Sequence, residues 1–351
     1  MVPFRKPVIK VFATGGSEEI AEWICKGLHE RIPAEFQPKG GLRLGKITAE
    51  KFSNDNIQVA IEDSVRGEFV IVVHSQVPPV NDHLMELFLL LDALKRAKVA
   101  DIMILFPYLP LSRSDKKNKP HISVGASFIG GMIGGYFGVK HVLCLDLHDP
   151  HIKHYFDGSD ADDVTAIYLI IDFLKKEVVS DSDDWMVVFA DAGSAKRYEE
   201  VGHLLGLPSA YIDKKRPKDD DNINISKVAG NVKNKRCILI DDEILTGGTT
   251  TKGADYLFDE GALSVSVAAI HAVMRAKGHK ENWVAKRLEK SRIERFIITD
   301  SIPIGKKIEE TSKFTVLRVG LLVAEAVKRL IMSESLTEMR GLDKVHLYNK
   351  D

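Results

Sequence analysis

The segment CILIDDEILTGGTT, at positions 237–250, combines residue types that suit a sugar phosphate. An apolar run leads to two adjacent acids, Asp241 and Asp242, and then to a turn of Thr246, Gly247, Gly248, Thr249 and Thr250. Such a turn at the start of a helix can offer backbone N–H groups and hydroxyls to one phosphate, and the helix dipole assists. The acids can accept hydrogen bonds from vicinal sugar hydroxyls or hold a cation's water shell. We therefore predict a sugar-phosphate site.

The elements that position these residues are short apolar runs rich in Val, Ile and Phe, at 69–75, 102–108, 141–148, 186–193, 236–243 and 295–301. They are typical of buried parallel strands. Stretches with helical spacing lie between them, at 18–28, 81–98, 161–177, 195–205 and 249–260. Alternating strands and helices predict an α/β architecture.

Polar residues close several of the predicted strands. In open parallel sheets ligands gather at the carboxyl ends of strands, so these residues are candidates for a site. They are Asp146, His148, Asp191, Asp241 and Asp242, with Asn81, Arg113 and Asp115 in the loops just beyond. Strand ends are also solvated, so under the competing interpretation about half of these polar residues are ordinary surface residues with no role in a site.

Length and composition narrow the class of protein. The chain has 351 residues, enough for two domains with separate cores. With a net charge of -1, the chain has no excess of positive charge that would bind a polyanion, so we do not expect nucleic acid as a partner. The three cysteines are too few for a disulfide framework and fit no paired metal spacing, which favours a cytoplasmic location. We expect neither a signal peptide nor a membrane span, because the longest weakly polar stretch, 128–139, is too short and glycine-rich.

Two polar segments are candidates for a boundary or an exposed loop. Residues 157–163 form a polar, turn-rich stretch, and we place the domain boundary there, giving domains at 1–162 and 163–338. Residues 214–224, KKRPKDDDNIN, carry charges that cannot be buried, so we expect a mobile exposed loop.

Six blocks in order resemble the ribose-phosphate pyrophosphokinase family over nearly the whole chain. The strand, acids and turn at 237–250 resemble the phosphoribosyl-binding loop of the type I phosphoribosyltransferase fold, which phosphoribosyltransferases share. The other five blocks, at 52–75, 78–117, 146–157, 190–197 and 211–217, resemble the pyrophosphokinase family, and a phosphoribosyltransferase is not expected to carry the first three. The resemblance implies two type I phosphoribosyltransferase-like domains, each a mainly parallel sheet flanked by helices, and a tail at 339–351 that returns to the first.

The resemblance also implies an ATP site. Phe52, Asn54 and Asn56 match the family's ATP-binding loop, in which the ring would stack on adenine; taken alone, Phe52 is equally a core residue. Arg113 and Ser114 match the next ATP contact. In the family the loop comes from a neighbouring subunit, so a homo-oligomer built from dimers, up to a hexamer, is implied. Without the resemblance, we interpret the nearby lysines as a solvated basic patch; they are Lys116, Lys117 and Lys119.

The same resemblance implies which residues contact the metal and which act in catalysis. His148 matches a metal-contacting histidine and Asp191 a carboxylate that reaches magnesium directly or through water. We prefer Mg²⁺ because substrate phosphates would supply its other oxygen ligands, and the spacing of His148, His151 and His154 provides no fixed zinc tetrahedron. Lys214 and Arg216 match the basic pair of the catalytic loop; a nuclear-localisation patch is the other interpretation of KKRPK.

The implied reaction transfers a pyrophosphoryl group from ATP to C1 of ribose 5-phosphate, giving AMP and 5-phosphoribosyl 1-pyrophosphate for nucleotide biosynthesis. Four positions depart from the family's usual residues: Asn56, Ser114, Ser194 and Leu245. Because of these departures, a second interpretation stays open, in which the chain is a catalytically silent homologue that regulates active subunits. A phosphoribosyltransferase is the third reading, and no spare segment supplies the nucleobase-binding hood it requires.

Overall fold

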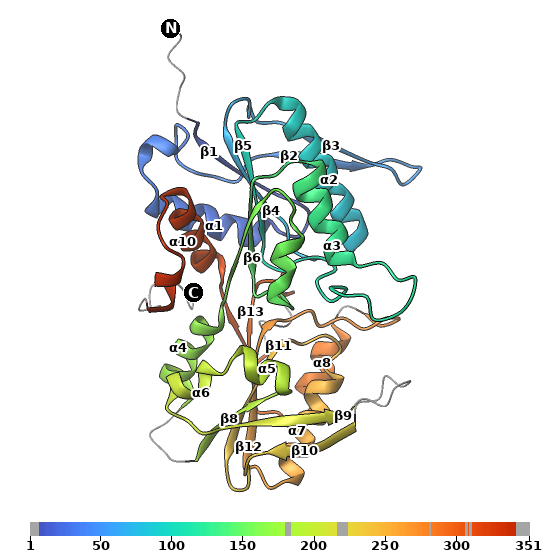
Figure 1. Ribbon diagram of the computed structural model, residues 1–351, viewed down its shortest axis with the longest axis vertical. Coiled ribbons are helices and arrows are strands. Elements are labelled where there is room, and N and C mark those ends of the chain that lie inside the picture. Colours follow the sequence, from blue (N-terminus) through green and yellow to red (C-terminus); the bar gives the residue numbers. More distant parts are fainter. Residues whose placement is uncertain are drawn as a thin grey trace. The chain divides into compact units, whose positions relative to one another are not determined.

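A computed structural model describes residues 7–179, 184–215, 224–280, 282–305, 308 and 311–341. The chain forms two compact units (Figure 1). The first contains residues up to Thr165, together with Ser301–Pro303 and the described part of Val319–Leu342. The second contains Ala166–Asp300 and Ile304–Arg318. Within the described residues, no helix is both long and apolar enough to cross a membrane.

The first unit is built on a 5-stranded parallel sheet with the order β1-β4-β5-β6-β7. Its strands are β1 (Ile9–Ala13), β4 (Phe69–Val73), β5 (Asp101–Phe106), β6 (His141–Leu145) and β7 (Asp160–Val164). Alternate strand residues form one core with α2 (Val80–Ala97) and α3 (Gly125–Gly130). Helices α1 (Glu18–Arg31) and α10 (Gly320–Ile331) pack together in the same unit. Short helical segments are η1 (Ala34–Phe36), η2 (Gly131–Tyr136), η3 (Pro150–Tyr155) and η4 (Thr337–Gly341).

A separate antiparallel hairpin, β2 (Ile47–Lys51) and β3 (Ile57–Ile61), projects from the first unit (Figure 1). Its turn is closed by hydrogen bonds from the Phe52 N–H to the Asn56 carbonyl and from the Asp55 N–H to the Phe52 carbonyl, with N···O distances of 2.8 and 2.9 Å. Asp55 has a left-handed φ of 66°, a conformation that aspartate tolerates in turns. The hairpin therefore presents its tip to solvent.

The second unit is built on a 7-stranded sheet with the order β10-β9-β8-β11-β12-β13-β14. All pairs are parallel except β10 with β9. The strands are β8 (Trp185–Phe189), β9 (Ser209–Lys215), β10 (Asn224–Ala229), β11 (Arg236–Glu243), β12 (Ser264–His271), β13 (Arg295–Thr299) and β14 (Phe314–Leu317). The helices that the structure describes in full are α4 (Ile167–Glu177), α5 (Ala192–Arg197), α6 (Glu200–Leu205), α7 (Gly248–Asp259) and α8 (Trp283–Glu289).

The six strands predicted from apolar runs are all present and parallel, which confirms the α/β class. The predicted helix at 161–177 is wrong at its start, because Asp160–Val164 forms β7 and its backbone pairs with β6. In the stretch 157–163 the predicted turn is present at 157–159, whereas 160–163 belongs to β7, and the first compact unit continues to Thr165. The predicted helix at 195–205 is two short helices, α5 and α6. Most of the 214–224 loop, at 216–223, lies outside the described residues.

Helix α10 lies far from α1 in sequence but packs against it. We expected residues up to 338 in the second domain, whereas α10 groups with the first unit. A Cβ built at Gly27 would lie 2.6 Å from the Cβ of Ala324, so only glycine permits this close approach. Gly320 faces the side chain of Trp23 in the same way.

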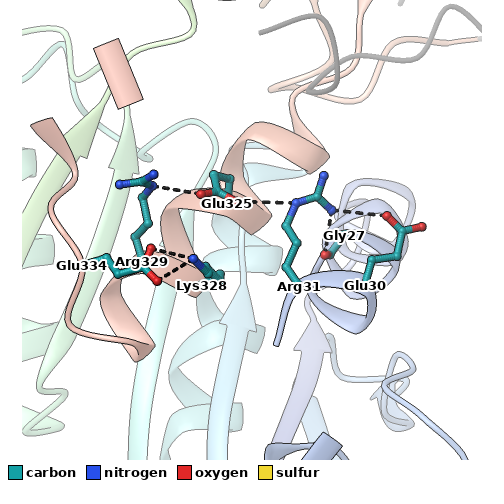
Figure 2. Close-up of polar contacts among 7 residues, drawn as sticks. All are labelled: Gly27, Glu30, Arg31, Glu325, Lys328, Arg329 and Glu334. Carbon is teal, nitrogen blue, oxygen red and sulfur yellow. Dashed lines mark hydrogen bonds and ion pairs between the residues drawn. The ribbon is translucent and has the colours of Figure 1, made fainter. Parts of the chain in front are cut away.

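Polar contacts fix this helix pair (Figure 2). Glu325 accepts a hydrogen bond from the Arg329 Nε at 2.9 Å and forms an ion pair with the Arg31 Nε at 3.5 Å. Arg31 also donates to the Gly27 carbonyl, with an N···O distance of 2.8 Å. The Arg329 and Glu325 side chains are only 9% and 14% exposed, so their charges depend on each other for solvation.

We expect Glu325→Ala to lower the free energy of unfolding by about 1–3 kcal/mol, because it leaves two arginines without their shared carboxylate. The matched control is Asp92→Ala, which breaks the Asp92–Arg96 pair, also spaced i,i+4 but with side chains 41% and 78% exposed. The control should be close to wild type. Urea unfolding of both variants tests this, and equal midpoints for the two would contradict it.

Candidate functional site

The predicted phosphate loop lies between β11 and α7. Helix α7 begins at Gly248, so the last three residues of the loop form its first turn. Inside the turn the Thr246 Oγ1 accepts a hydrogen bond from the Gly248 N–H at 3.4 Å, and the Thr251 hydroxyl donates to the Gly247 carbonyl at 2.9 Å. These contacts hold the first turn of a 12-residue helix, whose leading N–H groups have no acceptor inside the helix. The loop thus has the geometry of an anion site at a helix start.

Gly247 is required by the backbone of this loop. Its φ of 72° is in the left-handed region. A Cβ at this position would also lie 2.7 Å from the Leu288 Cδ2 of α8. The loop is therefore fixed both by its own dihedral angle and by packing against a buried leucine.

The two acids lie in the last three residues of β11. The Asp241 Oδ1 accepts hydrogen bonds from the Asp242 N–H at 3.0 Å and from the Ser194 hydroxyl at 3.2 Å. The Asp242 Oδ2 lies 3.9 Å from the Arg197 Nη1. Both acids are partly buried, so their oxygens are oriented by neighbouring groups as well as by water.

Ser194 connects two of the predicted site carboxylates. Asp191 caps α5, because its Oδ1 accepts from the Ser194 N–H at 2.9 Å. The hydroxyl of the same serine donates to Asp241, and the residue is 8% exposed. The ends of β8 and β11 are neighbours in the sheet, so this link joins the two strand ends. Sequence reasoning noticed Ser194 only as a departure from the family and assigned it no role.

Arg287 of α8 is a second residue that sequence reasoning missed. Its guanidinium nitrogens lie 3.7 and 3.8 Å from the position a Cβ would take on Gly248. Its guanidinium also lies over the Trp283 ring, at 5.6 Å from the centroid. The cation therefore stands beside the first residue of α7. Nothing in the sequence marks it, because it is 39 positions from Gly248 in an amphipathic helix.

The catalytic basic pair falls at the limit of the described residues. Lys214 belongs to β9, where it pairs with Ile225, and its side chain is not among those described. Arg216 lies outside the described residues. The assignment of both to the catalytic loop stays a prediction.

The adenine-site residues of the first unit lie on the β2–β3 hairpin. Phe52 is 47% exposed, so the alternative that makes it a core residue is wrong. Asn54 accepts a hydrogen bond from the Asn56 N–H at 3.2 Å, and both residues are exposed. An exposed aromatic ring beside amide groups can stack on a base.

Arg113 and Ser114 follow β5 and differ in their surroundings. Arg113 is exposed. The Ser114 hydroxyl accepts from the Gly125 N–H at 3.1 Å and donates to the Ser123 carbonyl at 3.3 Å. Ser114 therefore closes the loop that leads into α3, and these contacts compete with a direct contact to ATP.

His148 is exposed after β6, in the first unit, whereas Asp191 belongs to the second. The backbone before His148 is fixed because the buried Asp146 accepts a hydrogen bond from the Thr165 hydroxyl at 2.7 Å. His151 instead contacts Asp149. Its backbone N–H is the main reason that the pKa of Asp149 is lowered, and the charges of His151 and Lys116 add to it.

The metal that a site can hold depends on the donor atoms of its side chains. Among the described residues, no group of three or more His, Cys, Asp or Glu side chains is placed so that it could hold a metal ion. Magnesium typically uses one or two carboxylates together with substrate phosphates and water. Asp191 and Asp241, linked through Ser194, supply oxygen donors of this kind.

The comparisons with known proteins decide the family. A family model of the N-terminal domain of ribose phosphate pyrophosphokinase matches residues 9–135, and one of the phosphoribosyl synthetase-associated domain matches residues 182–340. Ribose-phosphate pyrophosphokinase 1 of Listeria monocytogenes is 34% identical over 95% of this chain and 97% of its own length. The chain belongs to the ribose-phosphate pyrophosphokinase family.

Further members of the ribose-phosphate pyrophosphokinase family agree. The Fusobacterium nucleatum enzyme is 34% identical over 94% of this chain and 98% of its own length. The crystal structure of phosphoribosylpyrophosphate synthetase from Mycobacterium smegmatis matches with a TM-score of 0.80 and 29% identity, over 93% of this chain and 99% of that one. This match confirms the predicted fold class, two type I phosphoribosyltransferase-like domains with mainly parallel sheets.

We expect Gly247→Ala to lower the free energy of unfolding of this family member by about 1–3 kcal/mol, since it adds both backbone strain and a contact with Leu288. Gly248→Ala is the matched control, because its Cβ would meet no atom closer than 3.5 Å and its φ is not positive. The control should be neutral or slightly stabilising. Calorimetric unfolding measures both, and two equally stable variants would show that the loop relaxes freely.

Proposed function

We propose that this chain is a working ribose-phosphate pyrophosphokinase, which converts ATP and D-ribose 5-phosphate to 5-phosphoribosyl 1-pyrophosphate and AMP. The observation that carries the proposal is the phosphate loop and double acid of β11–α7 in a chain that matches the family over 95% of its length. The product would supply nucleotide biosynthesis, and a cytoplasmic location suits both substrates.

The second unit is proposed to bind ribose 5-phosphate. The Thr246–Thr250 loop, that is Thr246, Gly247, Gly248, Thr249 and Thr250, would hold the 5-phosphate through backbone N–H groups and hydroxyls. Asp241 and Asp242 would accept hydrogen bonds from the ribose hydroxyls. Ser194 holds one Asp241 oxygen, which leaves that carboxylate a restricted orientation toward the sugar.

The first unit is proposed to bind ATP. Phe52 would stack on adenine, with Asn54 and Asn56 at its edge, and Arg113 would contact the phosphates. Ser114 is the weakest of these assignments, because its hydroxyl is engaged within its own loop. We propose a homo-oligomer based on dimers, since in the family this hairpin serves a neighbouring subunit.

Magnesium is the proposed cofactor, with His148 and Asp191 as its protein contacts. When bound, the ion would neutralise charge on the phosphate oxygens. The carboxylate oxygens suit magnesium better than the imidazole nitrogen does, so Asp191 is the stronger of the two assignments.

The reaction depends mainly on alignment and charge. The C1 hydroxyl oxygen of ribose 5-phosphate attacks the β-phosphorus of ATP in line; the new O–P bond forms as the bond from that phosphorus to the AMP oxygen breaks. The hydroxyl and acid contacts fix the sugar relative to the phosphorus. Lys214 and Arg216 are proposed to balance the charge that develops on the transferred group.

We expect the purified protein to release AMP from ATP with magnesium only when ribose 5-phosphate is present. The double variant Lys214→Ala, Arg216→Ala should lose about 100-fold or more in kcat, because two cations that act in the transition state are removed. The control, Lys175→Ala with Lys176→Ala, removes an exposed basic pair on α4 and should retain the activity. AMP formation is followed by chromatography.

The AMP measurement distinguishes a working enzyme from a silent homologue and tests the roles of the basic pair. No AMP under varied phosphate and metal would overturn the proposal and leave the silent regulatory homologue. Activity that survives in the double variant would leave the enzyme but reject the roles of Lys214 and Arg216.

We expect Ser194→Ala to raise the KM for ribose 5-phosphate about 3–10-fold while kcat changes less than about twofold, because one hydrogen bond that orients Asp241 is lost. Ser127→Ala, an exposed serine of α3, is the control. Steady-state kinetics with each substrate varied tests this. An unchanged KM for the sugar phosphate would mean that the Ser194–Asp241 contact does not influence substrate binding.

A further inference from the structure

A cavity of about 520 Å³ lies in the first unit and is unconnected with the residues proposed for ATP. It opens at the amino ends of the parallel strands, where Ile9, Phe69 and His141 are the first residues of β1, β4 and β6. The ATP and metal assignments lie beyond the carboxyl ends of the strands or on the β2–β3 hairpin. Its volume is in the range of small-molecule sites in proteins.

One wall of the cavity is α10. Leu330 and Ile331, at the end of this helix, line it. The preceding turn is held by the pairs of Glu325 with Arg31 and Arg329 (Figure 2). Arg329 also donates to the Ser335 carbonyl at 2.7 Å. The wall is therefore preformed, which reduces the entropic cost of binding.

The floor is apolar and one side is acidic. Phe36, Phe69 and Met103 supply apolar surface, and Asp160 and Asp162 of β7 supply two carboxylates. Among the described residues that line the cavity there is no lysine or arginine. His141 is the one basic residue among the described residues of the lining, and its Nε2 lies 3.7 Å from the Oδ2 of Asp101, which does not line the cavity.

The negative charge of the Asp162 carboxylate has no close partner to offset the cost of its burial. It is partly buried, and burial is the main cause that raises its pKa; the charge of Lys153 acts in the opposite direction. Within the part of the chain that the structure describes, the side-chain carboxylates of Asp160 and Asp162 neither accept a hydrogen bond nor pair with a cation within 4 Å. A partly buried carboxylate is stabilised by a cation or a hydrogen-bond donor.

From this geometry we propose that the cavity is a second binding site, for a small organic cation with an apolar or aromatic body and an ammonium or amidinium group. The body would occupy the apolar floor and the cationic group would meet Asp160 and Asp162. A nucleotide is disfavoured, because its phosphates would face two carboxylates and no lining arginine or lysine.

The probe pair is tryptamine and its neutral analogue tryptophol, which share the indole body and differ in the charged group. Isothermal titration of the full-length protein should show tryptamine binding at least about tenfold tighter than tryptophol, the scale of one charge-assisted contact. The variant Asp160→Asn with Asp162→Asn should lose this difference. Asp157→Asn, an exposed acid of the same unit outside the cavity, should keep it.

A second variant, Ile331→Trp, adds bulk to the wall and should weaken both probes by a similar factor, with far-UV circular dichroism verifying the fold. Absence of tryptamine binding at about 1 mM would overturn the proposal, since this is the weak limit for a small ligand. Equal affinity for the two probes would also overturn it, as would affinity unchanged in the double asparagine variant. These outcomes are independent of catalytic activity.

Discussion

Parallel strand pairing is the constraint on which this structure depends. Parallel strands place all their carboxyl ends at one edge of a sheet, so the residues that follow them are brought together wherever they lie in the sequence. Asp191 follows β8, and Asp241, about fifty positions later, lies near the end of β11; one serine hydrogen-bonds to both. In the second unit, the binding chemistry is thus a consequence of backbone hydrogen bonding as much as of side-chain choice.

The sequence was sufficient for the features that local chemistry encodes. Apolar runs such as 236–243 have few alternatives to a buried strand, and a threonine–glycine turn after two acids has a strong preference for a helix start. Strand β7 was missed because DADDV carries three carboxylates, and its place at the edge of the sheet, paired only with β6, is what tolerates them. Local propensity was overridden there by backbone pairing.

Features that arise from long-range packing could not be predicted. Arg287 reaches the phosphate loop through the packing of α8, and Ser194 contacts Asp241 because β8 and β11 are adjacent. The exposure of Phe52 required knowledge that β2 and β3 form a hairpin whose tip is exposed, although its base packs against the core. The residues proposed for ATP and magnesium were found by resemblance, since a lone histidine or asparagine carries no distinguishing local pattern.

The return of α10 to the first unit has a consequence for how the chain is made. The second unit is encoded as an insertion within the first, because residues on both sides of it contribute to one compact body. During synthesis, the face of α1 that carries Gly27 and Trp23 stays uncovered until α10 leaves the ribosome, after most of the chain has been translated. A fragment that stops near Thr165 would expose this face permanently. Separating the two units cleanly therefore requires joining the segments on either side of the insertion, rather than cutting the chain at one point.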